Sequence, residues 1–261
     1  MKPAARSHIA SSFTLIKGAM IDETYAVFAE WDFAYSKKEN LDRLRQQNFI
    51  GASTATWLRD VAKVLNRRFD PNTRDRALVL LAKHGCPIEE WKPILLWHVT
   101  RDEFLLRDFL INWLFPNFIS GTYRVRTEDL HDHLLNVRRR GGTTEHAWSE
   151  ATLNRVATAL LKMAVDFGLL RGSVAKEFAS YHLPERSFIY LLYAFREEQR
   201  SPLKVLESVD WRMFLMLPTD VERELLRLHQ YRKVDYQIAG SIVQLTLPYA
   251  NACEYAERMV A

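Results

Sequence analysis

The densest positive charge in the chain is a run of three arginines, Arg138, Arg139 and Arg140, which Gly141 and Gly142 follow directly. An arginine in a narrow minor groove gains from the enhanced negative potential there, and glycines let the backbone follow such a groove. We therefore predict that this connector contacts DNA. The alternative is an ordinary solvated loop.

A helix with one polar face is predicted directly after the connector, in WSEATLNRVATALLKMAVDFG, with Ser149 as its N-cap. Its apolar residues have the i, i+3, i+4, i+7 spacing of an amphipathic helix, and they are Leu153, Val156, Ala157, Leu160, Leu161, Ala164 and Val165. The opposite face carries residue types that reach phosphates and base edges in a DNA groove, namely Thr152, Asn154, Arg155, Thr158 and Lys162. We predict that these five residues bind DNA, although a solvated helix face has the same pattern.

The elements around this helix favour a winged-helix segment. Before the arginines, RTEDLHDHLLNV predicts a helix whose apolar stripe is Leu130, Leu134, Leu135 and Val137. Later in the chain, Val174 to Phe178 predicts a short strand in the position of a wing. A winged helix normally has a further short helix between the two central ones, and RRRGGTTEHA is poorly suited to form it. Two amphipathic helices joined by a polar loop are the plainer alternative.

A second cationic surface is predicted between Trp57 and Arg76, where six basic residues accompany three acidic ones. Ser53 is placed to cap a helix here, whose inner face carries Trp57, Leu58, Val61 and Leu65. The basic residues of its outer face and beyond are Arg59, Lys63, Arg67, Arg68, Arg74 and Arg76. We predict phosphate contacts from Arg59, Lys63, Arg67 and Arg68, with a solvated helix face as the alternative.

The last third of the chain repeats the order of helix and hairpin. Asp220 to Gln230 predicts a helix, and VDYQIAGSIVQLTLPY then alternates apolar and polar residues around Gly240, which predicts a β-hairpin from Val234 to Leu247. This region is therefore predicted as a second winged-helix-like module. Simple packing of a hairpin on helices is the alternative.

Several classes of chemistry lack support in the sequence. No glycine-rich phosphate loop, H-E-x-x-H or G-x-S-x-G motif is present, and the chain holds 9 glycines. His131 and His133 lie two apart on a predicted helix and so face different directions, which makes a poor chelate. Two distant cysteines favour neither a disulfide framework nor a cysteine-rich zinc site. We therefore expect no catalytic residue, metal, cofactor or small-molecule substrate.

The charge and the apolar runs set the broad class. A net charge of +4 is a mild excess, so a nucleic-acid surface must be local. No apolar run approaches the roughly 20 residues that a membrane span needs, and the first residues lack the apolar core of a secretion signal. We expect a soluble, cytoplasmic protein without membrane contact. The chain is expected to begin as a mobile arm that becomes ordered at Phe13, where a helical spacing starts that runs to Trp31.

Four segments in this order resemble the BrxA family, the small A component of bacterial BREX phage-exclusion systems. They are SSFTLIKGAMIDETYAVFAEWDF, ASTATWLRDVAKVLNRRF, WKPILLWHVTRDEFLLRDFLINWLFP and TLNRVATALLKMAVDFGLL, between Ser11 and about Leu183. The resemblance implies a mainly helical protein, distantly similar in fold to the antitermination factor NusB, with winged-helix-like elements. It also implies binding to nucleic acid, above all double-stranded DNA, and no enzymatic role.

The predicted fold is mainly α, a NusB-like helical bundle with winged-helix-like elements and a C-terminal β-hairpin. We predict an N-terminal helical domain over 1–118, a winged-helix-like segment over 119–183 and a C-terminal helical domain with the hairpin over 184–261. The predicted function is that of a non-enzymatic DNA-binding accessory protein of a phage-defence system, which binds mainly through phosphates. The alternatives are an adaptor that docks other defence proteins and an RNA-binding NusB-like factor.

Overall fold

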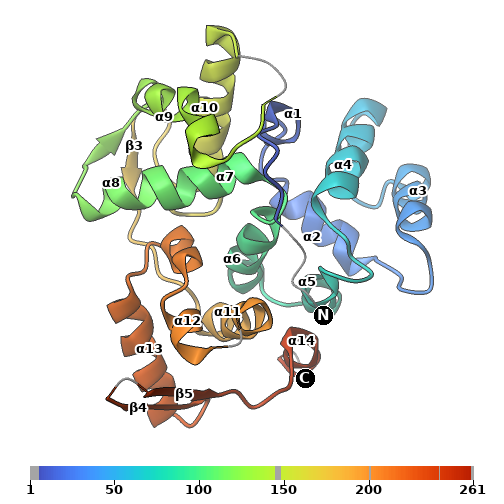
Figure 1. Ribbon diagram of the computed structural model, residues 1–261. Coiled ribbons are helices and arrows are strands. Elements are labelled where there is room, and N and C mark those ends of the chain that lie inside the picture. The colour runs from blue at the N-terminus through green and yellow to red at the C-terminus, as the bar shows by residue number, and fades with distance from the viewer. Residues whose placement is uncertain (1–5, 145–147, 200, 241, 260–261) are drawn as a thin grey trace.

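A computed structural model describes residues 6–144, 148–199, 201–240 and 242–259, and it is mainly helical, as predicted (Figure 1). The helices of the N-terminal part are α1 (Ser12–Leu15), α2 (Ile21–Ala29), α3 (Lys37–Gln47), α4 (Ala55–Arg68), α5 (Arg76–Lys83), α6 (Ile88–Val99), α7 (Phe104–Phe109) and α8 (Phe115–Ile119). A π-helical turn, Leu110–Leu114, joins α7 to α8, so the two form one continuous rod.

Local hydrogen bonds explain where these helices begin and end. The spacing from Ser12 to Trp31 does not form one helix, because the amides of Lys17 and Gly18 bond back to Thr14 and Leu15 and close a turn between α1 and α2. Thr54, one residue after the predicted Ser53, caps α4 by accepting a hydrogen bond from the amide of Trp57.

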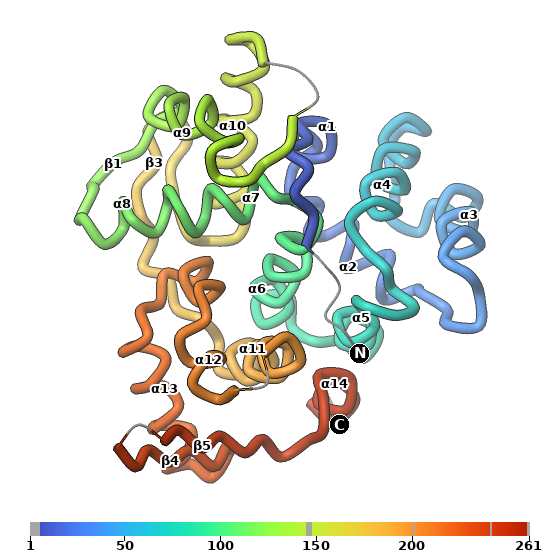
Figure 2. The backbone as a smooth tube through the Cα atoms, viewed as in Figure 1, coloured from blue at the N-terminus to red at the C-terminus, as the bar shows by residue number. Residues whose placement is uncertain are grey.

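The middle of the chain forms a small sheet with helices over it. Its elements are β1 (Arg124–Val125), a 3₁₀ turn (Glu128–Leu130), α9 (His131–Leu135), a second 3₁₀ turn (Val137–Arg140), α10 (Glu150–Asp166), β2 (Leu170–Arg171) and β3 (Lys176–Phe178). The three strands are antiparallel in the order β1-β3-β2, with Arg124 opposite Glu177 and Leu170 opposite Phe178. Strand β1, which was not predicted, is thus joined to the hairpin β2–β3 although the helices separate them in sequence (Figure 2).

The C-terminal part contains the predicted hairpin. Its elements are α11 (Glu185–Glu198), α12 (Pro202–Leu206), a 3₁₀ turn (Val209–Phe214), α13 (Pro218–Gln230), β4 (Asp235–Ala239), β5 (Ile242–Thr246) and α14 (Ala252–Arg258). Asp235 pairs with Thr246 and Ala239 with Ile242, so the predicted hairpin is confirmed. Within the described residues no third strand joins it, and the hairpin packs on α12 and α13 instead.

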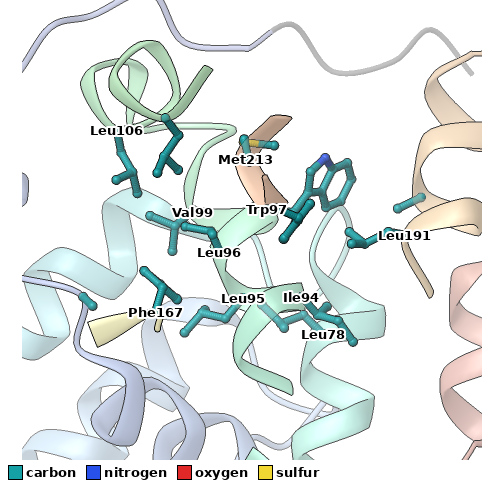
Figure 3. Close-up of a cluster of buried hydrophobic side chains, with 14 of the residues drawn as sticks. Leu78, Ile94, Leu95, Leu96, Trp97, Val99, Leu106, Phe167, Leu191 and Met213 are labelled. Atoms are coloured by element: carbon teal, nitrogen blue, oxygen red, sulfur yellow. The ribbon is translucent and has the colours of Figure 1, made fainter. Parts of the chain in front are cut away.

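The core runs through all three parts of the chain. Figure 3 shows Leu96 and Trp97 of α6 among Leu106 of α7, Phe167 directly after α10, Leu191 of α11 and Met213 of the 3₁₀ turn Val209–Phe214. Trp91, Trp97 and Phe109 are buried, so these aromatic residues belong to the core. No helix of the described residues is long and apolar enough to cross a membrane.

Candidate nucleic-acid interface

Helix α10 presents a polar stripe to solvent. Ser149 caps it, as predicted, by accepting a hydrogen bond of 3.3 Å from the amide of Thr152. The predicted apolar face is buried except for Val165, which is half-buried. The exposed residues Ala151, Arg155, Thr158 and Lys162 follow at i, i+4, i+7 and i+11, a stripe about 16 Å long at 1.5 Å per residue. This stripe carries two cations and no acid.

Two of the five predicted residues of α10 are engaged within the protein. Thr152 and Asn154 are half-buried. The Thr152 hydroxyl lies 3.0 Å from that of Ser149, and the Asn154 amide oxygen lies 3.0 Å from His131 Nε2. Asn154 therefore ties α10 to α9, whereas Arg155, Thr158 and Lys162 remain available to a ligand.

The stripe of helix α9 differs from the prediction at one position. Leu130, Leu134 and Val137 are buried, but Leu135 is 62% exposed. The reason is that the segment divides into two 3₁₀ turns around a five-residue α-helix, so its residues do not keep one 3.6-residue period.

The hairpin β2–β3 forms a short projection after α10. Gly172 turns the chain with φ of 101°, and a Cβ there would lie 2.7 Å from the carbonyl oxygen of Ala175. Val174 is 84% exposed. The Arg171 side chain is also exposed, with Glu177 at 3.5 Å. Arg171 was missed from the sequence, although its place at a Gly-Ser turn was a usable signal.

The glycines predicted a connector whose backbone can follow a DNA groove, but in the structure the connector packs against α7. Val137–Arg140 is a 3₁₀ turn, and Gly142 is buried against the first residue of α7. A Cβ on Gly142 would lie 2.7 Å from Phe104 and 2.8 Å from Val137, so this glycine allows close packing. Residues 145–147 of the connector lie outside the described residues.

The three arginines have three different environments. Arg140 Nε bonds to Asp108 at 2.9 Å and its Nη2 bonds to the carbonyl oxygen of His133 at 2.6 Å, so the guanidinium of Arg140 is engaged within the protein. Arg138 is exposed and donates to the Thr144 hydroxyl at 2.7 Å. Arg139 is exposed, and its side chain has no hydrogen-bond partner among the described residues.

Asp108 of α7 binds both α9 and the arginine connector. Burial raises the pKa of Asp108, but His133 Nε2 at 2.9 Å, Arg140 and Asn112 outweigh burial and lower its pKa well below the ordinary value. The carboxylate is thus kept charged, and the clamp on α9 and the connector persists at neutral pH.

Two of the four predicted contacts on α4 are internal. Arg68 is 0% exposed, its Nε bonds to Glu103 at 2.9 Å, and its Nη2 bonds to the Thr14 carbonyl at 3.0 Å. DNA cannot reach it, and the prediction for Arg68 is wrong. Arg67 is half-buried and bonds to the Ser11 hydroxyl at 2.8 Å.

Arg59 and Lys63 remain on the exposed side of α4. Arg59 donates to the Thr56 hydroxyl at 3.2 Å, and Lys63 Nζ lies 4.2 Å from the centre of the Phe13 ring. Phe13 belongs to α1, which also packs against α10 (Figure 1). Helix α1 therefore bridges the two predicted cationic helices.

A cleft of about 390 Å³ near this bridge has mixed charge. Its lysines are Lys17, Lys92 and Lys162, and its acids are Asp22, Glu23, Glu89 and Asp166. The cleft therefore does not extend the positive stripe of α10 toward α4, and the two exposed cationic sites remain separate.

Comparison with known families identifies the chain. The family model BrxA matches residues 11–193, which is more than half of the 261 residues. No curated protein matches the chain. The resemblance noted between Ser11 and about Leu183 is thereby confirmed. The chain belongs to the BrxA family, and this membership suggests a component of a BREX phage-defence system.

Proposed function

We propose that this protein is a non-enzymatic, cytoplasmic accessory protein of a BREX system that binds double-stranded DNA. The observation that carries the proposal is the exposed stripe of α10, with Arg155, Thr158 and Lys162. Helix α10 belongs to the segment from β1 to β3, in which one strand is followed by helices and then by a hairpin. The winged-helix assignment is supported by the sheet order β1-β3-β2 and by the 3₁₀ turn Val137–Arg140, which lies between α9 and α10 where a short middle helix is expected.

In this arrangement α10 is the helix that enters the major groove, and the tip of β2–β3 is the wing. The wing offers Arg171 and the hydroxyl of Ser173 close to the backbone of the duplex. The proposed contacts are few and charged, so the affinity is mainly electrostatic and falls steeply with salt.

The test is fluorescence anisotropy with a labelled duplex of unrelated sequence, titrated at several salt concentrations. The double variant Arg155→Ala with Lys162→Ala should bind about tenfold more weakly at 0.1 M salt, and the slope of log affinity against log salt should fall by about 0.9 for each lost contact. A matched control removes one arginine and one lysine from the C-terminal part, Arg223→Ala with Lys204→Ala, where both side chains are exposed.

Three outcomes would redirect the proposal. No salt-sensitive binding at micromolar protein would favour the adaptor that docks other defence proteins. Preference for structured RNA in competition with duplex DNA would favour the RNA-binding reading. Equal losses in the α10 variant and in the C-terminal control would show that net charge, and no particular surface, governs binding.

A further inference from the structure

The segment before α1 forms hydrogen bonds to other parts of the protein along its length. A mobile arm was predicted up to Phe13, but residues 6–11 are bonded to distant parts of the chain, which corrects that prediction; residues 1–5 lie outside the described part. The amide of Ser7 bonds to the Arg101 carbonyl at 3.0 Å, and the Ser11 hydroxyl accepts from Arg67. Six consecutive residues therefore contact several separate elements.

The first fastening is Arg6. Its guanidinium bonds to Glu198 at 3.0 Å and to Asp210, a buried carboxylate of the C-terminal part. Arg107 at 2.6 Å and the indole N–H of Trp97 at 3.1 Å also donate to Asp210. Burial raises the pKa of Asp210, but Arg6 and Arg107 outweigh it and lower the pKa below its ordinary value. Asp210 is thus a charged anchor for Arg6.

The second fastening is on the connector before α10. Ile9 forms a parallel bridge with Thr143. The amide of Thr143 donates to the His8 carbonyl at 2.8 Å, and the amide of Ala10 donates to the Thr143 carbonyl at 2.8 Å. The Thr143 hydroxyl adds a bond of 3.1 Å to the same His8 carbonyl.

Residues 6–11 are connected to α10 in two ways, through Thr143 and through α1. Thr143 precedes the N-cap Ser149 by six residues, and residues 6–11 lead into α1, which packs against α10. The contacts of Arg6 with the C-terminal part therefore restrain a segment that is bonded to Thr143 and that leads into α1 beside α10.

We propose that residues 6–10 form a strap that positions α10, with Arg6 as the positioning residue that anchors it. Arg6 itself touches no DNA. Its effect on DNA binding rests on the proposed function, whereas its effect on the connector does not.

The test measures both effects on Arg6→Ala. Amide hydrogen exchange should become at least about tenfold faster at Thr143, because its N–H is bonded across the strap, while the amides of α5 and α6 keep their rates. Affinity for duplex DNA should fall about threefold to tenfold, since α10 is less well positioned before it binds. Arg6→Lys keeps the charge and should restore part of both losses.

Arg107→Ala is the matched control, because it removes another partner of Asp210 without touching the strap. It should leave exchange at Thr143 near the wild-type rate. Unchanged exchange at Thr143 in Arg6→Ala, or an equal increase across the whole chain, would overturn the strap. Wild-type protein that fails to bind DNA would refute the proposed function, and exchange at Thr143 would still decide the strap.

Discussion

Helices α4 and α10 have similar sequence patterns, but they differ in the exposure and the contacts of their basic side chains. Each has an apolar face, a hydroxyl N-cap and a cationic outer face. On α10, Arg155 and Lys162 stay exposed on one stripe. On α4, Arg67 and Arg68 turn inward and bond to residues before α2 and to Glu103. Two of the four predicted contacts on α4 are therefore engaged within the protein, while Arg59 and Lys63 remain exposed.

The residues after α4 show the same effect. Arg74 Nη2 lies 2.9 Å from Asp75 and 2.5 Å from Asp102, and Arg76 lies 3.9 Å from the centre of the Phe33 ring. Of the six cations between Trp57 and Arg76, four are thus used to hold the N-terminal helices together. A run of basic residues can serve the fold as well as a ligand, and only their partners distinguish the two.

The largest expected effect is on stability, at Arg68. Arg68→Ala leaves the buried carboxylate of Glu103 without its partner and should lower the free energy of unfolding by about 3–5 kcal/mol. Urea unfolding measures this, with Arg59→Ala on the same helix as a control that should change it by less than about 0.5 kcal/mol. A stable Arg68→Ala variant with weakened DNA binding would break the comparison between the helices.

The clamp at Asp108 should give a somewhat smaller effect that depends on pH. Asp108→Asn should cost about 2–3 kcal/mol at pH 7, since it leaves Arg140 and His133 without their charged partner. The pKa of Asp108 is lowered in the fold, so the stability it contributes is present above the ordinary value of 3.8 and is lost as pH falls further.

Urea unfolding of wild type and Asp108→Asn at several pH values tests this dependence. The difference between them should shrink as pH falls below about 4, where the carboxyl group becomes protonated. A difference that stays unchanged or grows below about pH 4 would contradict the assignment of the clamp.

A smaller effect is expected at Arg139, the connector arginine whose side chain has no partner in the described residues. Arg139→Ala should leave stability within about 0.5 kcal/mol of wild type. If Arg139 contacts a phosphate, the salt slope falls by about 0.9, whereas Arg140→Ala should mainly lower stability. Anisotropy and urea unfolding of the two variants separate these roles, and equal behaviour would disprove the distinction.

The smallest effect is expected from the exposed cations of α4. Arg59→Ala with Lys63→Ala should reduce DNA affinity less than twofold, because these residues lie outside the segment from β1 to β3 that contains α10. The same anisotropy assay measures it beside the α10 variant. A loss as large as that of Arg155→Ala with Lys162→Ala would extend the DNA surface across α1 to α4.

Periodic patterns predicted much of the fold. Local spacing and turn chemistry determine the apolar face of α10, its Ser149 cap and the hairpin around Gly240. These features could therefore be predicted from the sequence. Strand β1 was not, because two residues carry no period and are defined only by pairing with Lys176 and Glu177.

The sequence by itself determined a mainly helical chain, its family and the polar stripe of α10, because helical period and caps depend on neighbouring residues. Tertiary structure alone decided which cations are free. Arg68, Arg140 and Arg6 find their carboxylates 35, 32 and 192 or more residues away, and no local pattern records such distances. A charge that is removed from water requires a partner, and these three arginines bind carboxylates within the protein. Arg155 and Lys162 remain exposed on α10.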